Sequence, residues 1–79
     1  MAAPFHVFIK DGDALAEVDA VLGALAARGV SREASGFAKY MHVVQAKQTV
    51  VMIESRESAL SAELRGRAGW REPGDVPLK

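Results

Sequence analysis

The sequence predicts an α+β domain in which one antiparallel β-sheet carries two helices on the same face. Three features predict it: strand periodicity at residues 5–10, a long stripe of helical periodicity directly after it, and a β-branched run at residues 48–54. Strands and helices joined by short connections pack as layers around one core. The chain has 79 residues, which suffices for a single core, so we expect one domain, residues 1–79.

The first strand is predicted at residues 5–10, where large apolar and other side chains alternate. Alternation places successive side chains on opposite faces of a sheet. The odd-numbered side chains from Phe5 to Ile9 are expected to face the helices. The even-numbered side chains, His6, Phe8 and Lys10, are expected to face away from them.

The first helix is predicted at residues 14–28. Asp13 precedes it and has the carboxylate that suits an N-cap. Gly29 suits the left-handed position just after a helix, and Val30 is placed for the apolar contact of a Schellman motif. One continuous apolar stripe at helical spacing runs through the segment: Leu15, Val18, Val21, Leu22 and Leu25.

An antiparallel hairpin is predicted from residues 38–45 and 48–54, with Ala46 and Lys47 at the turn. The second segment is rich in β-branched residues, which favour strands. The first segment has a competing interpretation as a helix, because its large apolar side chains also fit a helical stripe and Ala-Lys is weak turn chemistry.

The second helix is predicted from a cap at Ser55 to about Arg65, ending at Gly66 or Gly69. The short apolar face of this helix comprises Ala59, Leu60 and Leu64. Trp70, after the helix, is expected to pack back onto the domain.

Residues 71–79 are predicted to form an edge strand or an extended tail, because Pro73 and Pro77 cannot donate the hydrogen bonds of a central strand. The resulting order is strand, helix, strand, strand, helix and a last strand. This βαββα(β) order is that of ferredoxin-like domains, in which both helices cover one face of an antiparallel sheet.

The other face of such a sheet is left open, and a partly apolar open face is commonly covered by a second copy or by a partner. On the expected alternation, Phe8, Tyr40 and His42 lie on this face. Trp70 and Arg71 are residue types that often anchor interfaces. We therefore predict an interface with a partner protein, or with a second copy in a homodimer, at these five residues.

Composition excludes several classes of function. Ten basic residues balance ten acidic ones, so the chain lacks the positive charge with which proteins hold nucleic acid. The sequence has no cysteine, which rules out disulfides and thiolate metal sites. It has neither a membrane span nor a leader, so a cytoplasmic location and no membrane contact are expected.

The run from Val7 to Val18, followed by Leu22 and by Gly29-Val30, resembles the start of an ACT domain. The resemblance covers residues 5–30. It implies a regulatory module that pairs side by side through its sheet and binds an amino acid or similar small ligand near the first strand-helix turn. In this chain that turn comprises Asp11, Gly12 and Asp13.

No motif pairs a nucleophile with a base, and the only histidines, His6 and His42, have no carboxylate at metal-ligand spacing. The sequence thus predicts no catalytic residue, no metal and no cofactor. The predicted function is that of a small non-catalytic binding protein that docks a partner protein and modulates or inhibits it. The alternative is an amino-acid-sensing regulatory dimer of ACT type.

Overall fold

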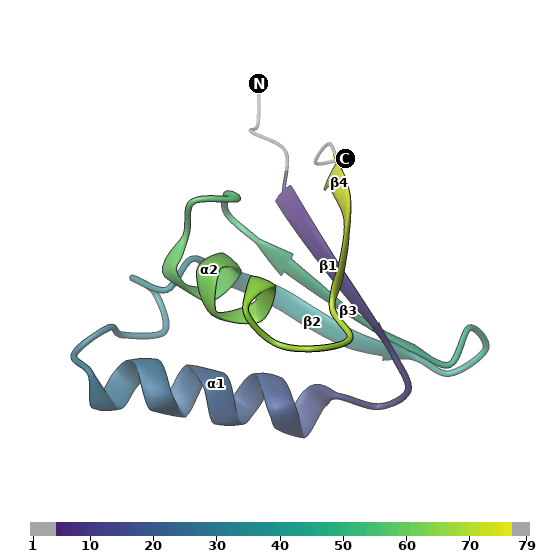
Figure 1. The fold of residues 1–79 in the computed structure, drawn as a ribbon, viewed down its shortest axis with the longest axis horizontal. Coiled ribbons are helices and arrows are strands. Elements are labelled where there is room, and N and C mark those ends of the chain that lie inside the picture. The colour runs from purple at the N-terminus through teal and green to yellow at the C-terminus, as the bar shows by residue number, and fades with distance from the viewer. Residues whose placement is uncertain (1–4, 77–79) are drawn as a thin grey trace.

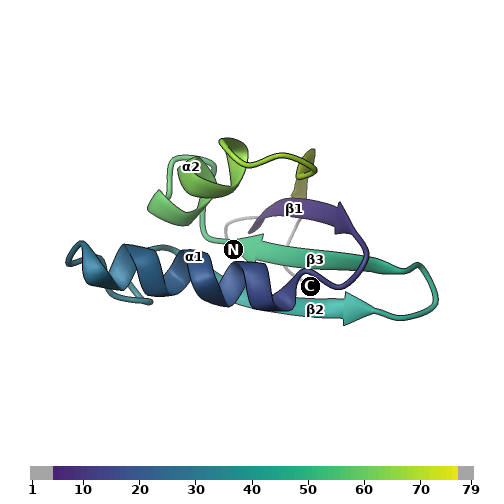
Figure 2. The same cartoon turned by 60° about the horizontal axis from the view of Figure 1, so that its bottom comes forward.

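A computed structural model describes residues 5–76 of the chain, with side chains described to residue 73. The sheet has four strands in the order β2-β3-β1-β4, every neighbouring pair is antiparallel, and the helices lie together on one side (Figures 1 and 2). The elements are β1 (Phe5–Asp11), α1 (Leu15–Ala27), β2 (Phe37–Val43), β3 (Gln48–Ile53), α2 (Ala59–Arg65) and β4 (Arg71–Val76).

The predicted fold class is confirmed. Counted from the β4 edge, the strands stand in the order β4-β1-β3-β2, so the two halves of the chain interleave in the split βαβ arrangement of ferredoxin-like domains. The helical alternative for residues 38–45 is wrong, because β2 pairs with β3 along its length. The predicted last strand is β4 at the sheet edge, and residues 77–79 of that prediction lie outside the described residues.

The hairpin turn between β2 and β3 has a conformation that its sequence, Ala46-Lys47, does not favour. Lys47 takes a φ of 53°, in the left-handed region that a side chain disfavours. The turn is closed by the Lys47 amide, which donates to the Val44 carbonyl at 3.1 Å, and by the Gly12 amide, which donates to the Lys47 carbonyl at 2.7 Å. Contacts with the neighbouring β1–α1 turn therefore hold a conformation that local sequence alone does not favour.

Helix α1 spans Leu15–Ala27, one residue shorter at each end than predicted, and has the predicted capping motif after its last turn. Gly29 has a φ of 87°, and Val30 donates to the Leu25 carbonyl at 2.9 Å, as in a Schellman motif. The N-cap is Ala14, not Asp13, because the Ala14 carbonyl accepts the first helical hydrogen bond, from the Val18 amide at 3.1 Å. The Ala14 amide donates to the buried hydroxyl of Thr49 at 2.7 Å. Asp13 still helps from outside the helix, where its Oδ1 accepts from the Leu15 amide at 3.2 Å.

Helix α2 is shorter than predicted. It begins after Ser58, not Ser55, and ends at Gly66 as expected. Ser55 instead caps a separate turn, in which its hydroxyl accepts from the Glu57 amide at 3.3 Å and its amide donates to the Ser58 hydroxyl at 3.2 Å. The Ser61 hydroxyl donates to the Ser55 carbonyl at 2.7 Å and ties this turn to the helix.

The prediction of which β1 side chains face the helices is wrong. Phe8 is 0% exposed and lies opposite Val51, which is also fully buried against the helices. Alternation assigns residues to two faces but does not say which face the helices cover, and both faces of β1 carry apolar side chains. The fully buried core residues between the sheet and the helices are Phe8, Val18, Leu25, Val51, Ile53, Leu60 and Leu64.

Candidate functional site

The surface of the sheet opposite the helices, here called the open face, is the strongest candidate site. The strand register places Val7 beside Met52, and Ile9 beside Val50, which in turn lies beside Met41. Cross-strand neighbours point to the same side of a sheet, so these side chains form one continuous surface. The apolar members of the open face are Phe5, Val7 and Ile9 of β1, Met41 and Val43 of β2, and Val50 and Met52 of β3.

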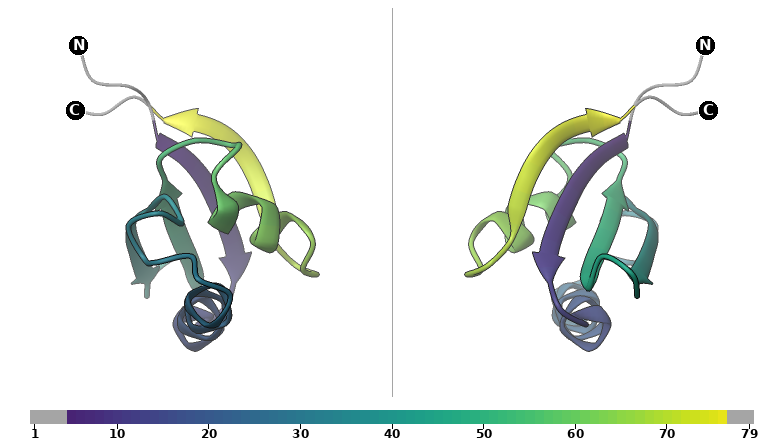
Figure 3. Two further views of the ribbon diagram at one scale, coloured as in Figure 1. Left: turned by 90° about the vertical axis from the view of Figure 1, so that its left-hand side faces the viewer. Right: turned by 90° about the vertical axis from the view of Figure 1, so that its right-hand side faces the viewer.

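The open face is uncovered by the elements that the structure describes. Figure 3 shows both helices behind the sheet in its right-hand view, with the strands in front. Val7 is only 3% exposed, whereas the other apolar members are partly exposed. An antiparallel sheet with one solvent-facing side usually carries polar side chains there, and this sheet is apolar on both sides.

Charged side chains lie around the apolar centre of the open face. Lys39 of β2 lies beside Met52 of β3. Arg71 of β4 lies beside Ile9 of β1, and Nη1 of Arg71 donates to Oδ1 of Asp11 at 3.3 Å. An apolar centre within a charged and polar rim is the common arrangement of protein–protein interfaces.

Of the five predicted interface residues, only Arg71 lies on the open face. Phe8 is in the core. Tyr40 and His42 face α1 and the β1–α1 turn: the Tyr40 hydroxyl donates to Oδ1 of Asp19 at 2.9 Å, and His42 lies 3.9 Å from Asp13. The faces of β2 are reversed from the prediction in the same way as those of β1, because both strands flank β3 and side chains opposite one another share a face.

Trp70 packs back onto the domain, as predicted, and is half-buried beside a charged cluster. The carboxylate of Glu17 accepts from Lys10 at 2.6 Å, from Arg67 at 2.7 Å and from the Trp70 indole at 3.4 Å. The Lys10 hydrogen bond is the main cause that lowers the pKa of Glu17 to about 2. This cluster joins β1, α1 and the chain before β4, which gives Trp70 a structural role.

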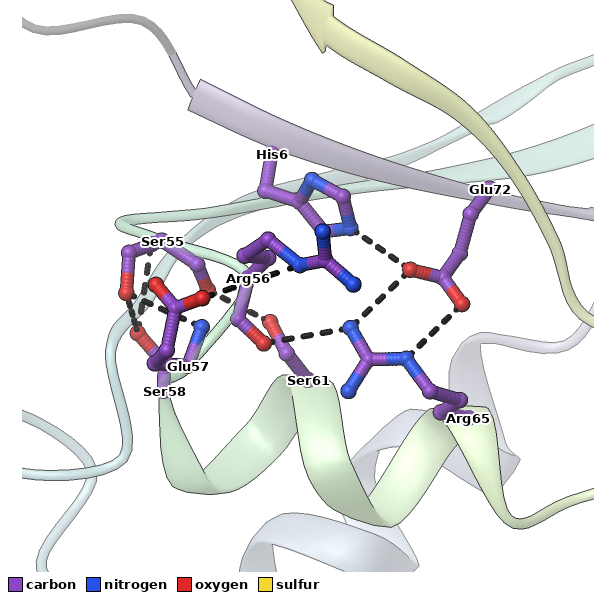
Figure 4. Close-up of polar contacts among 8 residues, drawn as sticks. All are labelled: His6, Ser55, Arg56, Glu57, Ser58, Ser61, Arg65 and Glu72. Carbon is purple, nitrogen blue, oxygen red and sulfur yellow. Dashed lines mark hydrogen bonds and ion pairs between the residues drawn. The ribbon is translucent and has the colours of Figure 1, made fainter.

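A second charged cluster joins α2, β1 and β4 (Figure 4). Arg65 donates to both oxygens of Glu72 at 2.9 Å, and Nε2 of His6 lies 2.8 Å from Glu72 Oε1. The Arg65 hydrogen bonds, with a smaller contribution from His6, lower the pKa of Glu72 to about 2. A bidentate pair of this kind fixes geometry. It anchors the last strand to the helix layer, and the nearby Ser61 hydroxyl is directed at a backbone carbonyl.

The predicted ligand turn of Asp11, Gly12 and Asp13 is occupied by internal hydrogen bonds. Gly12 has a φ of 83°, its amide donates to Lys47, and its carbonyl accepts from the Thr49 hydroxyl at 2.7 Å. The Gly12 amide and carbonyl are therefore used within the fold. The two aspartate side chains are largely exposed, Asp11 beside Arg71 and Asp13 beside His42.

Over residues 5–76, no group of acidic residues and histidines is arranged to hold a metal ion. Within the same range, neither helix combines the length and apolar character needed to cross a membrane. Comparison with protein-family models, with curated proteins and with solved structures gives no match to this chain.

Proposed function

We propose that this protein is a small non-catalytic binding protein that docks another protein on its open face and modulates that protein's activity. The observation that carries the proposal is the continuous apolar surface from Phe5 to Val43 across three strands, with no described element over it. Apolar surface of this extent in water favours association. The cytoplasmic location expected from the sequence belongs to the same proposal and is checked by cell fractionation.

The size of the open face indicates how a partner binds. A sheet of four strands, each of about six residues, has a flat area of roughly 400 Å² at the usual spacing and rise. A specific interface takes about 800 Å² from each partner. A docked protein therefore needs the whole sheet surface, including the charged rim with Lys39, Asp11 and Arg71, and contacts beyond the sheet as well.

A second copy of the chain is one form that the partner can take. A two-fold axis brings the same apolar surface of two copies together. The formal net charge of the chain is zero, so two copies have no long-range repulsion to overcome. A domain of this size also gains stability when association extends its core. The predicted homodimer thus belongs to this proposal.

The test places a charge at the centre of the open face. Val50→Glu should leave the monomer folded by circular dichroism, because the side chain is only partly buried. If the partner is a second copy, the variant should lose concentration-dependent self-association in sedimentation velocity. If the partner is another protein, the variant should no longer be cross-linked to it in the cells that express the protein. Ala24→Glu, an exposed position on α1, is the matched control. Equal behaviour of wild type, control and Val50→Glu in both measurements contradicts the proposal.

The alternative, an amino-acid-sensing dimer of ACT type, is supported by the ferredoxin-like strand order, which leaves β2 and β4 as edges for side-by-side pairing. Ligand binding to the folded state raises its stability. A thermal-shift screen over amino acids at millimolar concentration should then identify a stabiliser that Asp13→Asn abolishes. The absence of any shift argues against this function without affecting the open-face proposal.

A further inference from the structure

A groove of about 550 Å³ lies beside the edge strand β2, on the helix side of the sheet. In Figure 2, α1 runs alongside β2 at this edge. The groove is open to solvent and its walls come from α1, from the loop after it and from β2. The lining residues are Asp19, Leu22, Gly23, Ala26, Arg32 and Tyr40.

Gly23 in the groove wall has no structural explanation. It lies inside α1, where glycine is less favourable than alanine. It does not have the positive φ that would require glycine, and a Cβ added to it would meet nothing within 4 Å. Alanine stands at several other exposed positions of the same helix, so the helix itself tolerates a methyl group. What Gly23 provides is free space in the groove.

Both signs of charge occur in the groove lining. The guanidinium of Arg32 stacks on the Phe37 ring at 4.5 Å, whereas the side chain of Lys39, opposite Met52, belongs to the open face. The carboxylate of Asp19 is engaged by the Tyr40 hydroxyl at 2.9 Å. Arg32 therefore provides the groove lining with a cation, and a guanidinium with several N–H donors suits a carboxylate.

The free edge of β2 supplies the third feature. In the described sheet β2 pairs with β3 on one side only, so the backbone groups on its other side face outward. A register shift between Phe37 and Lys39 interrupts the regular edge at its start. The regular edge that is left runs from Lys39 to Val43, which is long enough for a short added strand.

We infer that an extended segment of a partner protein adds as a fifth strand to the free edge of β2. Its backbone pairs with residues Lys39 to Val43, as in other cases of strand addition. A small aliphatic side chain enters the groove over Gly23, and an acidic side chain two positions away on the same side meets Arg32. This site is separate from the open face and does not depend on the function proposed for it.

The probe is a phage-displayed library of random linear peptides selected on the wild-type protein, with affinities of the synthesised binders measured by fluorescence anisotropy. Selected peptides should share an acidic and a small aliphatic residue at alternate positions. Gly23→Leu fills the groove and should weaken binding by about tenfold or more. Ala24→Leu adds the same side chain at an exposed position of α1 outside the groove and should leave affinity unchanged.

Three further measurements separate strand addition from a merely structural role of these residues. Arg32→Glu should abolish binding, and a peptide with lysine in place of its acidic residue should restore it. Methylation of peptide amides at alternate positions should abolish binding, whereas methylation of the intervening amides should not. Slowed exchange of β2 amides in the complex should accompany binding.

Several outcomes overturn the inference. One is a selection that yields no binder to a folded protein. A second is that the selected peptides bind the Gly23→Leu variant as tightly as the wild type. A third is that Val50→Glu abolishes their binding and Gly23→Leu does not, which would place the peptides on the open face. A wild-type protein with the mass of a dimer in solution and a Gly23→Leu variant with the mass of a monomer would show that a second copy, and not a foreign segment, occupies the edge of β2.

Discussion

The two sides of the same sheet differ in what covers them far more than in how apolar they are. On the helix side, Phe8 and Val51 are fully buried, and the polar Thr49 and His6 in the same layer each have hydrogen-bond partners. On the open face the centre is aliphatic and sulfur-containing, and charge appears only at the rim. The helices therefore bury the inner side of the sheet, whereas the open face has the chemistry of a core surface and, apart from Val7 at 3% exposure, is partly exposed.

The largest expected effect tests this comparison at adjacent positions of one strand. Phe8→Ala should lower the free energy of unfolding by about 3–5 kcal/mol, because it leaves a cavity beneath α2. Ile9→Ala, on the open face, should lower it by only about 1 kcal/mol, because that side chain is partly exposed. Urea unfolding of both variants at low protein concentration measures the difference. Equal losses would mean that both faces are buried in the isolated chain.

A second prediction concerns the polar part of the helix side. The fully buried Thr49 hydroxyl accepts from the Ala14 amide and donates to the Gly12 carbonyl, each at 2.7 Å. Thr49→Val keeps the shape and leaves both backbone groups unpaired, so it should cost about 1–3 kcal/mol. Thr49→Ser retains the hydroxyl and serves as the control. A valine variant as stable as the serine variant would show that neither hydrogen bond contributes.

The third prediction uses pH and concerns the cluster that holds β4. The pKa of Glu72 is lowered from 4.5 to about 2 by Arg65 and then His6. A carboxyl whose pKa is lower in the folded state stabilises the fold above its unfolded pKa, and this contribution is lost as pH falls through the folded value. The urea midpoint of the wild type should thus fall between about pH 4.5 and pH 2.

Glu72→Gln tests that assignment. It should unfold at lower urea concentration than the wild type near neutral pH and show a shallower fall in acid. Glu17 has a similarly lowered pKa of about 2 and remains in this variant, so part of the acid dependence should persist. A pH profile identical to that of the wild type would show that the Glu72 cluster does not stabilise the fold. The effect is expected to be modest because the pair is partly exposed to solvent.

The sequence predicted the order of elements, the Schellman end of α1 and the edge position of the last strand, because each depends on local patterns such as the glycine at position 29. It did not predict which side of β1 faces the helices. Residues 5–9 are apolar at four of five positions, and the side that also carries the polar His6 and Lys10 is the side that faces the helices. Their partners, Glu72 for His6 and Glu17 for Lys10, come from other elements of the fold and are not visible in the strand pattern.

The same cause limited prediction of the candidate site. The existence of an open apolar sheet face followed from the element order, but its residues were assigned to the wrong side because a register is fixed by long-range packing. The groove beside β2 has a faint signal in the sequence, since Gly23 interrupts a run of helix-favouring residues. Only the fold shows that this glycine faces an edge strand.

The smallest expected effect is the most informative about the open face. Met52→Gln replaces an apolar side chain by a polar one of similar length at a partly exposed position beside Val7. In the isolated monomer its free energy of unfolding should change by no more than about 0.5 kcal/mol, because little burial is lost. If a partner or second copy covers this face, the same variant should weaken association in sedimentation velocity at high protein concentration. A surface kept apolar for binding predicts that Met52→Gln leaves stability at low concentration unchanged and weakens association. A large loss of stability in the dilute monomer would show instead that Met52 is part of the core.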